Sequence, residues 1–449
     1  MSRALLALLA LPTTARAGDW TGTPDQQAAA AANTASLNAA LAALVPGDTL
    51  VVPNHTYWMA GGVHAAGLHN VTLQLDGTLR FLPGRHGWPV QDCAAGGNPL
   101  QPARNGSCVK EAIYLANSSR LTLTSSGMGT LHGGGEAWWG YVPYLLHGED
   151  RPRLLSLTNA TDVLVERWRL EQSAYWTFTA FDVARLEVRH CAIDNRVNGD
   201  DKHSIANLGA LNTDGFDVAG RDIHIHHSSV WNQDDCVTIQ PLDARGHNAQ
   251  CTENVLVEDV AASGLGLTVG AVHPTRGHNC VRNVTFRRAT MHHTFKGIYV
   301  KSGNSTDALA SAEISRLTFE DVVMDAPSQV PIWIGPAQEA DSAGACSLLW
   351  PEAPFAKCPP PPTTIAWSDI TLRRIAIVAP VQSPGLVLGN AQRPMRNVRF
   401  DNVTVTPADP SKRPWKGRFY HCEGVDGVAS GGTAPVPPCF NVSLVEGQI

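Results

Sequence analysis

The sequence has few charged residues, and it lacks several kinds of binding site. These absences exclude some classes of function. Asp, Glu, Lys and Arg make up only 16% of its 449 residues, and the net charge is −6. Without a basic excess, nucleic-acid binding is not expected, and an acidic substrate would need a local basic patch. Beyond the first residues no stretch is long and apolar enough to span a bilayer. No Cys-x-x-Cys or His-x-x-x-His spacing occurs, which removes the usual signals of a zinc site.

Glycine, proline and apolar residues are what the chain has in quantity. It contains 40 Gly and 30 Pro, and hydrophobic residues make up 43%. This composition is typical of many short strands joined by tight turns, and it predicts an all-β protein. Although 449 residues would suffice for two or three domains, elongated β folds often use such a length as one. We therefore expect a single domain over residues 18–449.

The N-terminus has the layout of a secretory signal peptide. Arg3 is followed by an apolar run over residues 4–11 and then by Ala15-Arg16-Ala17. Basic, apolar and small-residue regions in this order predict cleavage after Ala17, which would remove residues 1–17. A short buried helix is the alternative interpretation. The signal peptide predicts a secreted, extracellular protein that is not held in a membrane.

Ten cysteines agree with an oxidising compartment, where an even number usually indicates disulfides. Local pairs that close Gly- or Pro-rich loops are Cys93 with Cys108, Cys346 with Cys358, and Cys422 with Cys439. The sequence does not assign Cys191, Cys236, Cys251 and Cys280.

Acceptor motifs of the Asn-x-Ser/Thr type are expected to carry glycans in a secreted chain. They occur at Asn54, Asn70, Asn105, Asn117, Asn159, Asn283, Asn304, Asn402 and Asn441. At Asn70, Asn283 and Asn402 the following Val-Thr also reads as a strand that begins after a turn residue.

A short motif recurs through the chain: a turn residue, an apolar residue, any residue and a second apolar residue. Its first positions are Asn70, Arg120, Asp162, Arg185, Asp222, Asn254, Asn283, Arg316, Asp369 and Asn397. A second strand-like run commonly follows, as at residues 235–240, 266–272, 297–301, 332–335 and 385–389. Intervals of about 20–50 residues without helical periodicity predict a right-handed parallel β-helix, a solenoid whose coils stack on one another. The irregular intervals argue against a β-propeller.

The open ends of such a solenoid must be covered. Residues 25–44 are rich in Ala and Leu, begin with a capping Asp25 and end before Pro46-Gly47, so they predict a helix within an N-terminal cap over residues 18–50. Residues 407–449, with the Cys422 to Cys439 loop, are expected to form a C-terminal closing flap.

Two acidic motifs lie one short repeat apart, at residues 212–218 (Asn-Thr-Asp-Gly-Phe-Asp-Val) and 232–237 (Asn-Gln-Asp-Asp-Cys-Val). Stacked coils align equivalent positions about 4.8 Å apart, so Asp214 is expected beside Asp234 and Asp235. Neighbouring carboxylates are what glycoside hydrolysis requires, because one protonates the leaving oxygen and others activate water. The alternative is that these Asx-rich motifs only form turns, which is the expected role of Asp217.

The ordered set of Asn-Thr-Asp-Gly, Asp-Asp-Cys, Gly264-Leu265-Gly266 and the strand with Lys301 resembles the polygalacturonase and rhamnogalacturonase family, glycoside hydrolase family 28 with the pectin lyase-like β-helix. The resemblance implies hydrolysis with inversion. It implies that Asp234 is the general acid, that Asp214 and Asp235 activate water, and that Asn212 lies near the groove. The sequence differs from the family pattern at Leu265, where the family has His, and at Tyr299, where it has Arg.

Further substrate contacts are expected at Lys301, Tyr299 and Trp176. The family's Arg and Lys bind the carboxylate of galacturonate, and a tyrosine hydroxyl does not replace a bidentate Arg. Unmodified polygalacturonate is therefore not the expected substrate, and rhamnogalacturonan-cleaving relatives are an alternative match. Trp176, next to Tyr175, would form a stacking platform for a sugar ring, unless both rings pack in the interior.

We therefore expect a secreted, monomeric glycosidase that cleaves α-linked, uronic-acid-containing polysaccharide without a cofactor or metal. One alternative is a polysaccharide lyase on the same fold, which eliminates across a uronate ring with Ca²⁺ and a basic residue. Another is a β-helix that binds carbohydrate without cleaving it. The lyase predicts an unsaturated product and inhibition by chelators, whereas the binding protein would release no new reducing ends.

Overall fold

The computed structural model describes residues 4–6, 24–93, 101–140, 149–196, 210–242, 250–338, 358–406 and 420–443. The chain forms two compact units. The first comprises Met1–Val218 and His224–Asp235, and the second comprises Ala219–Ile223 and Cys236–Ile449. That these units act as a single domain over residues 18–449 stays a prediction.

Short parallel strands make up most of the first unit, with one helix at its start. Its elements are β1 (Ala4–Leu6), α1 (Pro24–Ala42), β2 (Thr49–Val52), β3 (Thr56–Met59), β4 (Val63–Ala66), β5 (His69–Leu75), β6 (Thr78–Phe81), β7 (Val90–Gln91), β8 (Ala103–Arg104), β9 (Ser107–Val109), β10 (Ile113–Thr124), β11 (Gly129–His132), the 3₁₀ helix η2 (Gly135–Ala137), β12 (Leu155–Glu166), β13 (Trp168–Glu171), β14 (Phe178–Arg189) and β15 (Ala192–Asp194). β16 (Phe216–Trp231) contributes residues to both units.

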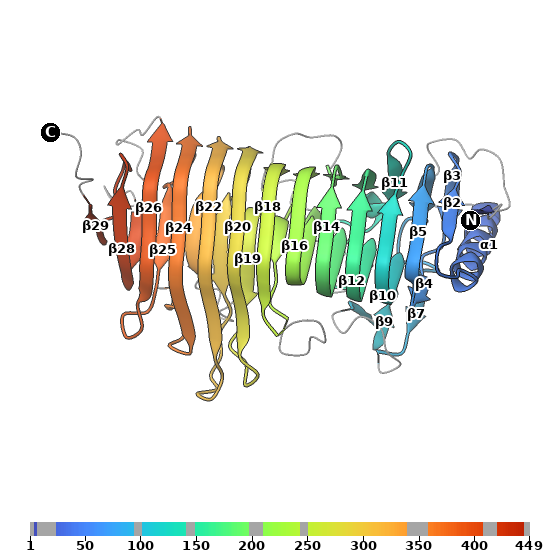
Figure 1. Cartoon of the computed structure of the whole chain (residues 1–449), viewed down its shortest axis with the longest axis horizontal. Coiled ribbons are helices and arrows are strands. Elements are labelled where there is room, and N and C mark those ends of the chain that lie inside the picture. The colour runs from blue at the N-terminus through green and yellow to red at the C-terminus, as the bar shows by residue number, and fades with distance from the viewer. Residues whose placement is uncertain are drawn as a thin grey trace. The chain divides into compact units, whose positions relative to one another are not determined.

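Most strands of the first unit pair in parallel with the equivalent strand one coil later, whereas β7, β8 and β9 form a small antiparallel sheet. β5, β10, β12 and β14 form one row, seen side by side in Figure 1, and β6, β11, β13 and β15 form another. The register places apolar residues of successive coils next to one another. Leu121 lies opposite Val163, and Val163 lies opposite Leu186. All three side chains are buried. Stacked apolar rows of this kind are the interior of a parallel β-helix.

The second unit repeats this pattern. Its strands are β17 (Asp235–Ile239), whose first residue belongs to the first unit, β18 (Thr252–Ser263), β19 (Gly266–Val272), β20 (Asn279–His292), β21 (Ile298–Ser302), β22 (Ala312–Asp325), β23 (Ile332–Pro336), β24 (Ile365–Val378), β25 (Gly385–Leu388), β26 (Met395–Thr406), β27 (Tyr420–Glu423), β28 (Val425–Ser430) and β29 (Phe440–Val442). β18, β20, β22, β24, β26 and β28 pair successively in parallel and lie side by side in Figure 1. Phe286 and Phe319 stack from neighbouring coils, with ring centroids 4.9 Å apart. The predicted all-β parallel β-helix is confirmed.

In the structure the chain bends at the turn residue of the repeated motif, and this residue has a left-handed backbone conformation. Its φ lies between +51° and +58° at all ten predicted positions, namely Asn70, Arg120, Asp162, Arg185, Asp222, Asn254, Asn283, Arg316, Asp369 and Asn397. Asn and Asp tolerate this region better than other residues with a Cβ. Several side chains at these bends bond along the stack, as where the Asn283 amide donates to Asn254 Oδ1 at 2.7 Å. The bends divide each long strand between two faces of the coil.

The helix α1 covers the first coils, as predicted from its sequence. Its buried residues follow one stripe, Ala30, Asn33, Thr34, Leu37 and Leu41. The polar members satisfy strand edges. Asn33 donates to the Trp58 carbonyl at 3.0 Å, and Thr34 Oγ1 accepts from the Ala60 N–H at 3.0 Å. These contacts supply partners that a further coil would otherwise provide.

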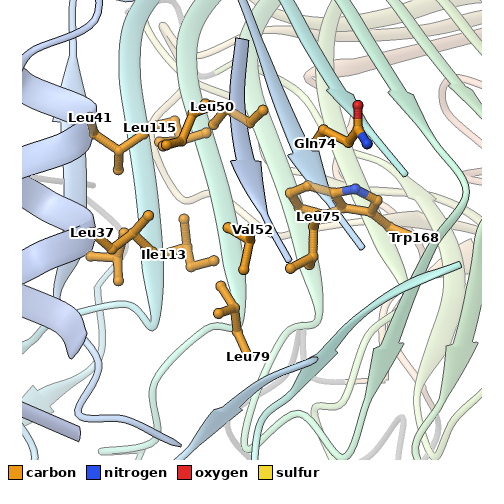
Figure 2. Close-up of a pocket in the computed structure, with 12 residues that line it drawn as sticks. Leu37, Leu41, Leu50, Val52, Gln74, Leu75, Leu79, Ile113, Leu115 and Trp168 are labelled. Carbon is orange, nitrogen blue, oxygen red and sulfur yellow. The ribbon is translucent and has the colours of Figure 1, made fainter. Parts of the chain in front are cut away.

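Beneath α1 lies an apolar cavity of about 40 Å³. Figure 2 shows Leu37 and Leu41 of the helix facing side chains of the first coils across it. Leu50, Leu75 and Trp168 line other sides. Leucine side chains of α1 thus close the end of the first unit's interior.

Two of the three predicted disulfides are present, Cys93 with Cys108 and Cys422 with Cys439. Cys358 is disulfide-bonded as well, and its predicted partner Cys346 lies outside the described residues. Of the four unassigned cysteines, Cys251 and Cys280 are joined, and Cys191 and Cys236 are buried thiols.

Strands near both ends of the chain also pair in parallel. β1, within the predicted signal peptide, pairs in parallel with β2. Within the predicted closing flap, β27, β28 and β29 continue the parallel pairing, and residues 407–419 and 444–449 lie outside the described residues. Of the helices that the structure describes, none has the length and apolar character needed to cross a membrane.

Candidate active site

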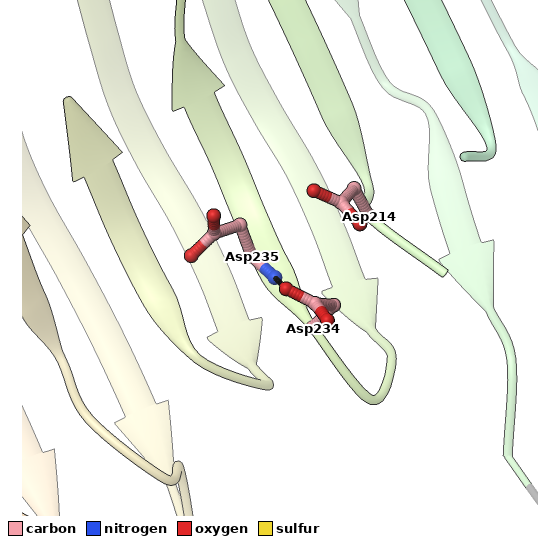
Figure 3. A group of neighbouring side chains, drawn as sticks. All are labelled: Asp214, Asp234 and Asp235. Atoms are coloured by element: carbon pink, nitrogen blue, oxygen red, sulfur yellow. Dashed lines mark hydrogen bonds between the residues drawn. The ribbon is translucent and has the colours of Figure 1, made fainter. Parts of the chain in front are cut away.

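Three carboxylates from neighbouring coils meet in the first unit, as the sequence predicts. Asp214 lies just before β16, Asp234 lies in the turn after it, and Asp235 begins β17. One oxygen of each lies within 4.8 Å of the others (Figure 3). Asp214 and Asp235 are 5% and 2% exposed, whereas Asp234 is half-buried. Asp234 is therefore the member that offers most surface to a substrate.

The backbone ladder explains this convergence. The Thr177 N–H donates to the Asp214 carbonyl at 2.8 Å, and the Gly215 N–H donates to the Asp235 carbonyl at 2.8 Å. Residues 177, 214–215 and 235 thus occupy successive coils at the same corner. Parallel pairing at this spacing brings side chains together that are 20 or more positions apart in the chain.

Backbone donors hold Asp234 in place. The Asn212 N–H donates to Oδ2 at 3.0 Å, and the Asp235 N–H donates to Oδ1 at 2.9 Å, the bond drawn in Figure 3. Both oxygens of the most exposed carboxylate are thereby oriented. Hydrogen bonds of this kind favour the ionised form of a carboxyl group.

Buried amides fix the turns that carry the acids. Asn232 donates from Nδ2 to the carbonyls of Thr213, at 3.0 Å, and Asp235, at 2.8 Å. Asn195 Nδ2 donates to Thr177 Oγ1 at 2.8 Å and, at 3.3 Å, to the Thr213 carbonyl. Both asparagines are fully buried. They tie the two acidic turns to each other and to the preceding coil.

Asn212, predicted to lie near the groove, is engaged within the protein. Its backbone adopts a φ of 58°, and its side-chain Nδ2 donates to Glu149 Oε2 at 3.0 Å. Arg151 holds Glu149 through two hydrogen bonds, from Nε at 2.8 Å and Nη2 at 2.7 Å. Asn212 therefore joins the acid cluster to the ion pair of Glu149 and Arg151.

The predicted sugar platform is a stacked pair of half-buried rings. Tyr175 and Trp176 have centroids 5.2 Å apart and an interplanar angle of 10°. The Arg153 guanidinium lies 4.6 Å from the Trp176 ring centroid, and that of Arg151 lies 5.4 Å from Tyr175. Burial is the chief reason that the pKa of Tyr175 is raised, so its hydroxyl stays protonated. Each ring thus has a cation beside it.

The remaining predicted contacts, Tyr299 and Lys301, belong to the second unit. Tyr299 is only 1% exposed, and its hydroxyl accepts from the Gln338 N–H at 3.1 Å. Ammonium groups of Lys296 and Lys301 each lie 4.7 Å from its ring centroid. Lys301 is 8% exposed. Tyr299 therefore packs against two cations. Lys301 is more exposed to solvent than Tyr299 is.

Several other side chains are placed as well. Trp138 and Trp333 are each 1% exposed, so these rings pack in the protein. Asp217, which was expected to form a turn, is fully buried within β16, so that expectation is wrong. His224, His226 and His227 lie on β16, where the rings of His224 and His226 stack at 4.2 Å.

Comparison with known proteins gives the family. Residues 69–422, most of the chain, match the sequence model described as glycosyl hydrolases family 28. The chain belongs to this family. The resemblance stated from its motifs is therefore confirmed, and the family 28 match includes all three acids.

Individual relatives of this family 28 chain are distant. It is 26% identical over 213 residues to endopolygalacturonase I of Aspergillus aculeatus, covering 47% of this chain and 50% of that protein. It is 27% identical over 293 residues to probable endo-xylogalacturonan hydrolase A of Aspergillus fumigatus, covering 64% and 63%. The chain thus spans about half to two thirds of the length of these relatives.

Solved structures share the fold of the family 28 chain. Endo-xylogalacturonan hydrolase from Aspergillus tubingensis superposes with a TM-score of 0.62 at 18% identity, covering 92% of this chain and 95% of that one. An exopolygalacturonase from Thermotoga maritima gives a TM-score of 0.66 at 16% identity, covering 96% and 93%. Both are similar in architecture.

Some residues that shape the family 28 site were not predicted. Asn195, Glu149 and Arg151 lie outside the two acidic motifs, and Glu149 is 63 positions from Asn212. No repeat or spacing links these positions, so only the folded coils reveal them.

The chemistry of the three acids admits two uses. Carboxylate oxygens in such a cluster can shuttle protons, and they are also the donors that Ca²⁺ and Mg²⁺ prefer. Asp214, Asp234 and Asp235 are close enough to ligate one ion together. Metal dependence is thus a matter for direct experiment.

Proposed function

We propose that this family 28 chain is a secreted, monomeric glycoside hydrolase. It cleaves α-glycosidic bonds in pectic or related uronic-acid-containing polysaccharide by acid/base catalysis with inversion. The observation that carries the proposal is the cluster of Asp214, Asp234 and Asp235, within 4.8 Å of one another. Relatives named for polygalacturonan and xylogalacturonan hydrolysis support the substrate class.

In this mechanism Asp234 protonates the glycosidic oxygen, and Asp214 and Asp235 activate water. Like charges repel, so crowded carboxylates do not all ionise easily. One oxygen of each of the three acids lies within 4.8 Å of the others, and this crowding supports the proposal that the cluster holds a proton for the leaving group.

The stereochemical outcome requires its own test. Inverting enzymes generally separate their two carboxyl groups by about 6.5–9.5 Å, and retaining enzymes by about 5–5.5 Å. The 4.8 Å spacing joins single oxygens of the acids and is not a separation between whole carboxyl groups. Inversion is proposed from the family resemblance alone, and ¹H NMR of the first anomer released decides it.

Two kinds of substrate contact are proposed, each from the chemistry of its own residues. Lys301 would pair with a uronate carboxylate, and the Tyr175 and Trp176 rings would stack against a sugar. Asn212 would line the site mainly through its backbone, since its amide is held by Glu149. Tyr299, at 1% exposure, would act by supporting Lys301 and not by touching the sugar.

Secretion is proposed on two grounds. Residues 1–17 have the signal-peptide pattern, and the three described disulfides together with bonded Cys358 suit an oxidising compartment. N-terminal sequencing of the protein recovered from culture medium tests this, because cleavage after Ala17 leaves a chain that begins at Gly18.

A reducing-end assay on polygalacturonate, xylogalacturonan and rhamnogalacturonan tests the activity. The hydrolase produces new reducing ends without ultraviolet-absorbing product, and chelator does not inhibit it. A polysaccharide lyase is the competing function, because the same acids could hold Ca²⁺. Unsaturated product and inhibition by chelator would establish the lyase, and binding without cleavage would establish a carbohydrate-binding protein.

A further inference from the structure

A buried arginine organises the backbone on which the acid cluster rests. Arg151 is 4% exposed. Its Nη1 donates to the Leu211 carbonyl at 2.8 Å and to the Ala174 carbonyl at 3.1 Å. Leu211 directly precedes Asn212, and Ala174 precedes the aromatic pair. One guanidinium thus clamps two loops of neighbouring coils.

The same arginine is bound to a carboxylate that reaches Asn212. Glu149 receives both Nε and Nη2 of Arg151, a bidentate pair that sets the plane of the carboxylate. Its Oε2 also accepts from Asn212 Nδ2 at 3.0 Å. Glu149 has a side-chain exposure of 23%, so it is partly shielded from water and salt. This pair therefore holds Asn212 by its side chain while Arg151 holds the preceding carbonyl.

Asn212 passes this constraint to Asp234. Its φ of 58° lies in the left-handed region, which Asn adopts more readily than most residues. In that conformation its N–H points at Asp234 Oδ2, 3.0 Å away. A turn of this peptide would remove one of the two donors that orient the carboxylate.

We propose that Glu149 and Arg151 are positioning residues for Asp234, acting through the side chain and N–H of Asn212. This inference rests on the proposed hydrolase function, to which it adds two residues outside the acidic motifs. A well-placed catalytic group is worth more than its contacts suggest, because a displacement of about 1 Å can reduce turnover about 100-fold. The pair is thus required for chemistry and not only for folding.

The experiment compares Glu149→Ala and Glu149→Gln with the wild type on the best polysaccharide substrate. Glu149→Ala removes the acceptor for Asn212, and kcat should fall about 10- to 100-fold while KM changes less than about threefold. Glu149→Gln keeps an acceptor oxygen and should recover most of kcat.

Asp162→Asn is the matched control, because it weakens another bidentate carboxylate–arginine pair of the first unit, with Arg185, that is exposed at the surface. It should leave kcat unchanged. The proposal is overturned if Glu149→Ala lowers only the unfolding temperature, or if the Ala and Gln variants lose kcat equally.

Crystal structures of the wild type and Glu149→Ala separate this inference from the proposed function. If the wild type cleaves no polysaccharide, the hydrolase proposal fails, and the structures still decide the positioning claim. Loss of the Asn212 N–H contact to Asp234 in the variant supports positioning, and an unchanged contact contradicts it.

Discussion

The orientation of the Asp234 side chain depends on the backbone around it. Its carboxylate is oriented by N–H groups of Asn212 and Asp235, and its exposure exceeds that of both neighbouring acids. The sequence motif identified the acid, and the fold supplies its orientation. Two other residues in the chain have environments distinctive enough to yield quantitative expectations, His132 and Gly266.

His132, the last residue of β11, should make stability depend on pH. Burial, aided by the charge of Arg80, lowers its pKa from 6.5 to about 4. Its neutral form accepts the Gly134 N–H at Nδ1. The folded state therefore resists protonation, so the stabilisation is present above pH 6.5 and is lost as pH falls toward 4.

The measurement is urea unfolding of wild type and His132→Gln at pH 7 and 4.5. Because each pKa unit corresponds to about 1.4 kcal/mol, the wild type should lose about 2–3 kcal/mol more than the variant between these pH values. Equal losses in both proteins would show that His132 is not the group responsible.

Gly266 is required where two coils approach closely. Its φ is +113°, and a Cβ there would lie 2.2 Å from the Gly297 carbonyl oxygen. Gly266→Ala should therefore destabilise the protein by about 2 kcal/mol or more, because backbone must move. Gly127→Ala is the control, since a Cβ at Gly127 meets nothing within 4 Å. Thermal unfolding of both variants checks this, and equal midpoints would contradict the steric argument.

At the scale of strands and bends, some features were predictable from the sequence and others were not. The recurring turn motif predicted a turn at ten positions, and all ten are left-handed bends, because the turn residue and the apolar pair after it are local properties of the sequence. Further left-handed bends, such as those at Asp182, Asp259 and Arg288, lie outside the motif. Burial was less predictable. β17, β21, β23 and β25 are buried along their whole lengths, so alternation does not separate inward from outward positions. Tyr299 was predicted to contact substrate because it stands where the family has Arg, and the buried strand β21 leaves it only 1% exposed.

The helix α1 should contribute stability chiefly through its leucine stripe. Leu37 is 5% exposed and lines the cavity of Figure 2, so Leu37→Ala enlarges an existing void. A loss of about 2–5 kcal/mol in unfolding free energy is expected. Ser36→Ala, on the exposed face of the same helix, should be neutral within about 0.5 kcal/mol. Similar losses for both would mean that helix propensity, and not packing, governs α1.

The chain as a whole belongs to family 28, and its two altered motif positions set the question of substrate. Without an Arg at position 299, the pairing of a uronate carboxylate would fall to Lys301. A lysine is a single charged donor and lacks the planar fork of arginine. We expect a lower kcat/KM for polygalacturonate than in enzymes with the Arg, and steady-state kinetics on that polysaccharide measures it.

At the scale of the whole molecule, the sequence predicted those features that depend on local or repeated motifs. The three acids were predicted to meet because a solenoid aligns equivalent positions, whereas Glu149 and Arg151 became visible only through contacts made by folding. Long-range side-chain bonds leave no periodic trace in a single sequence.

The most direct test of the account is turnover by Asp234→Asn beside the wild type and the Asp162→Asn control. The account predicts that Asp234→Asn loses about 10²–10⁴-fold in kcat, because an amide cannot donate the proton, while circular dichroism and unfolding temperature are retained. Turnover within about twofold of the wild type by a folded Asp234→Asn protein would contradict it.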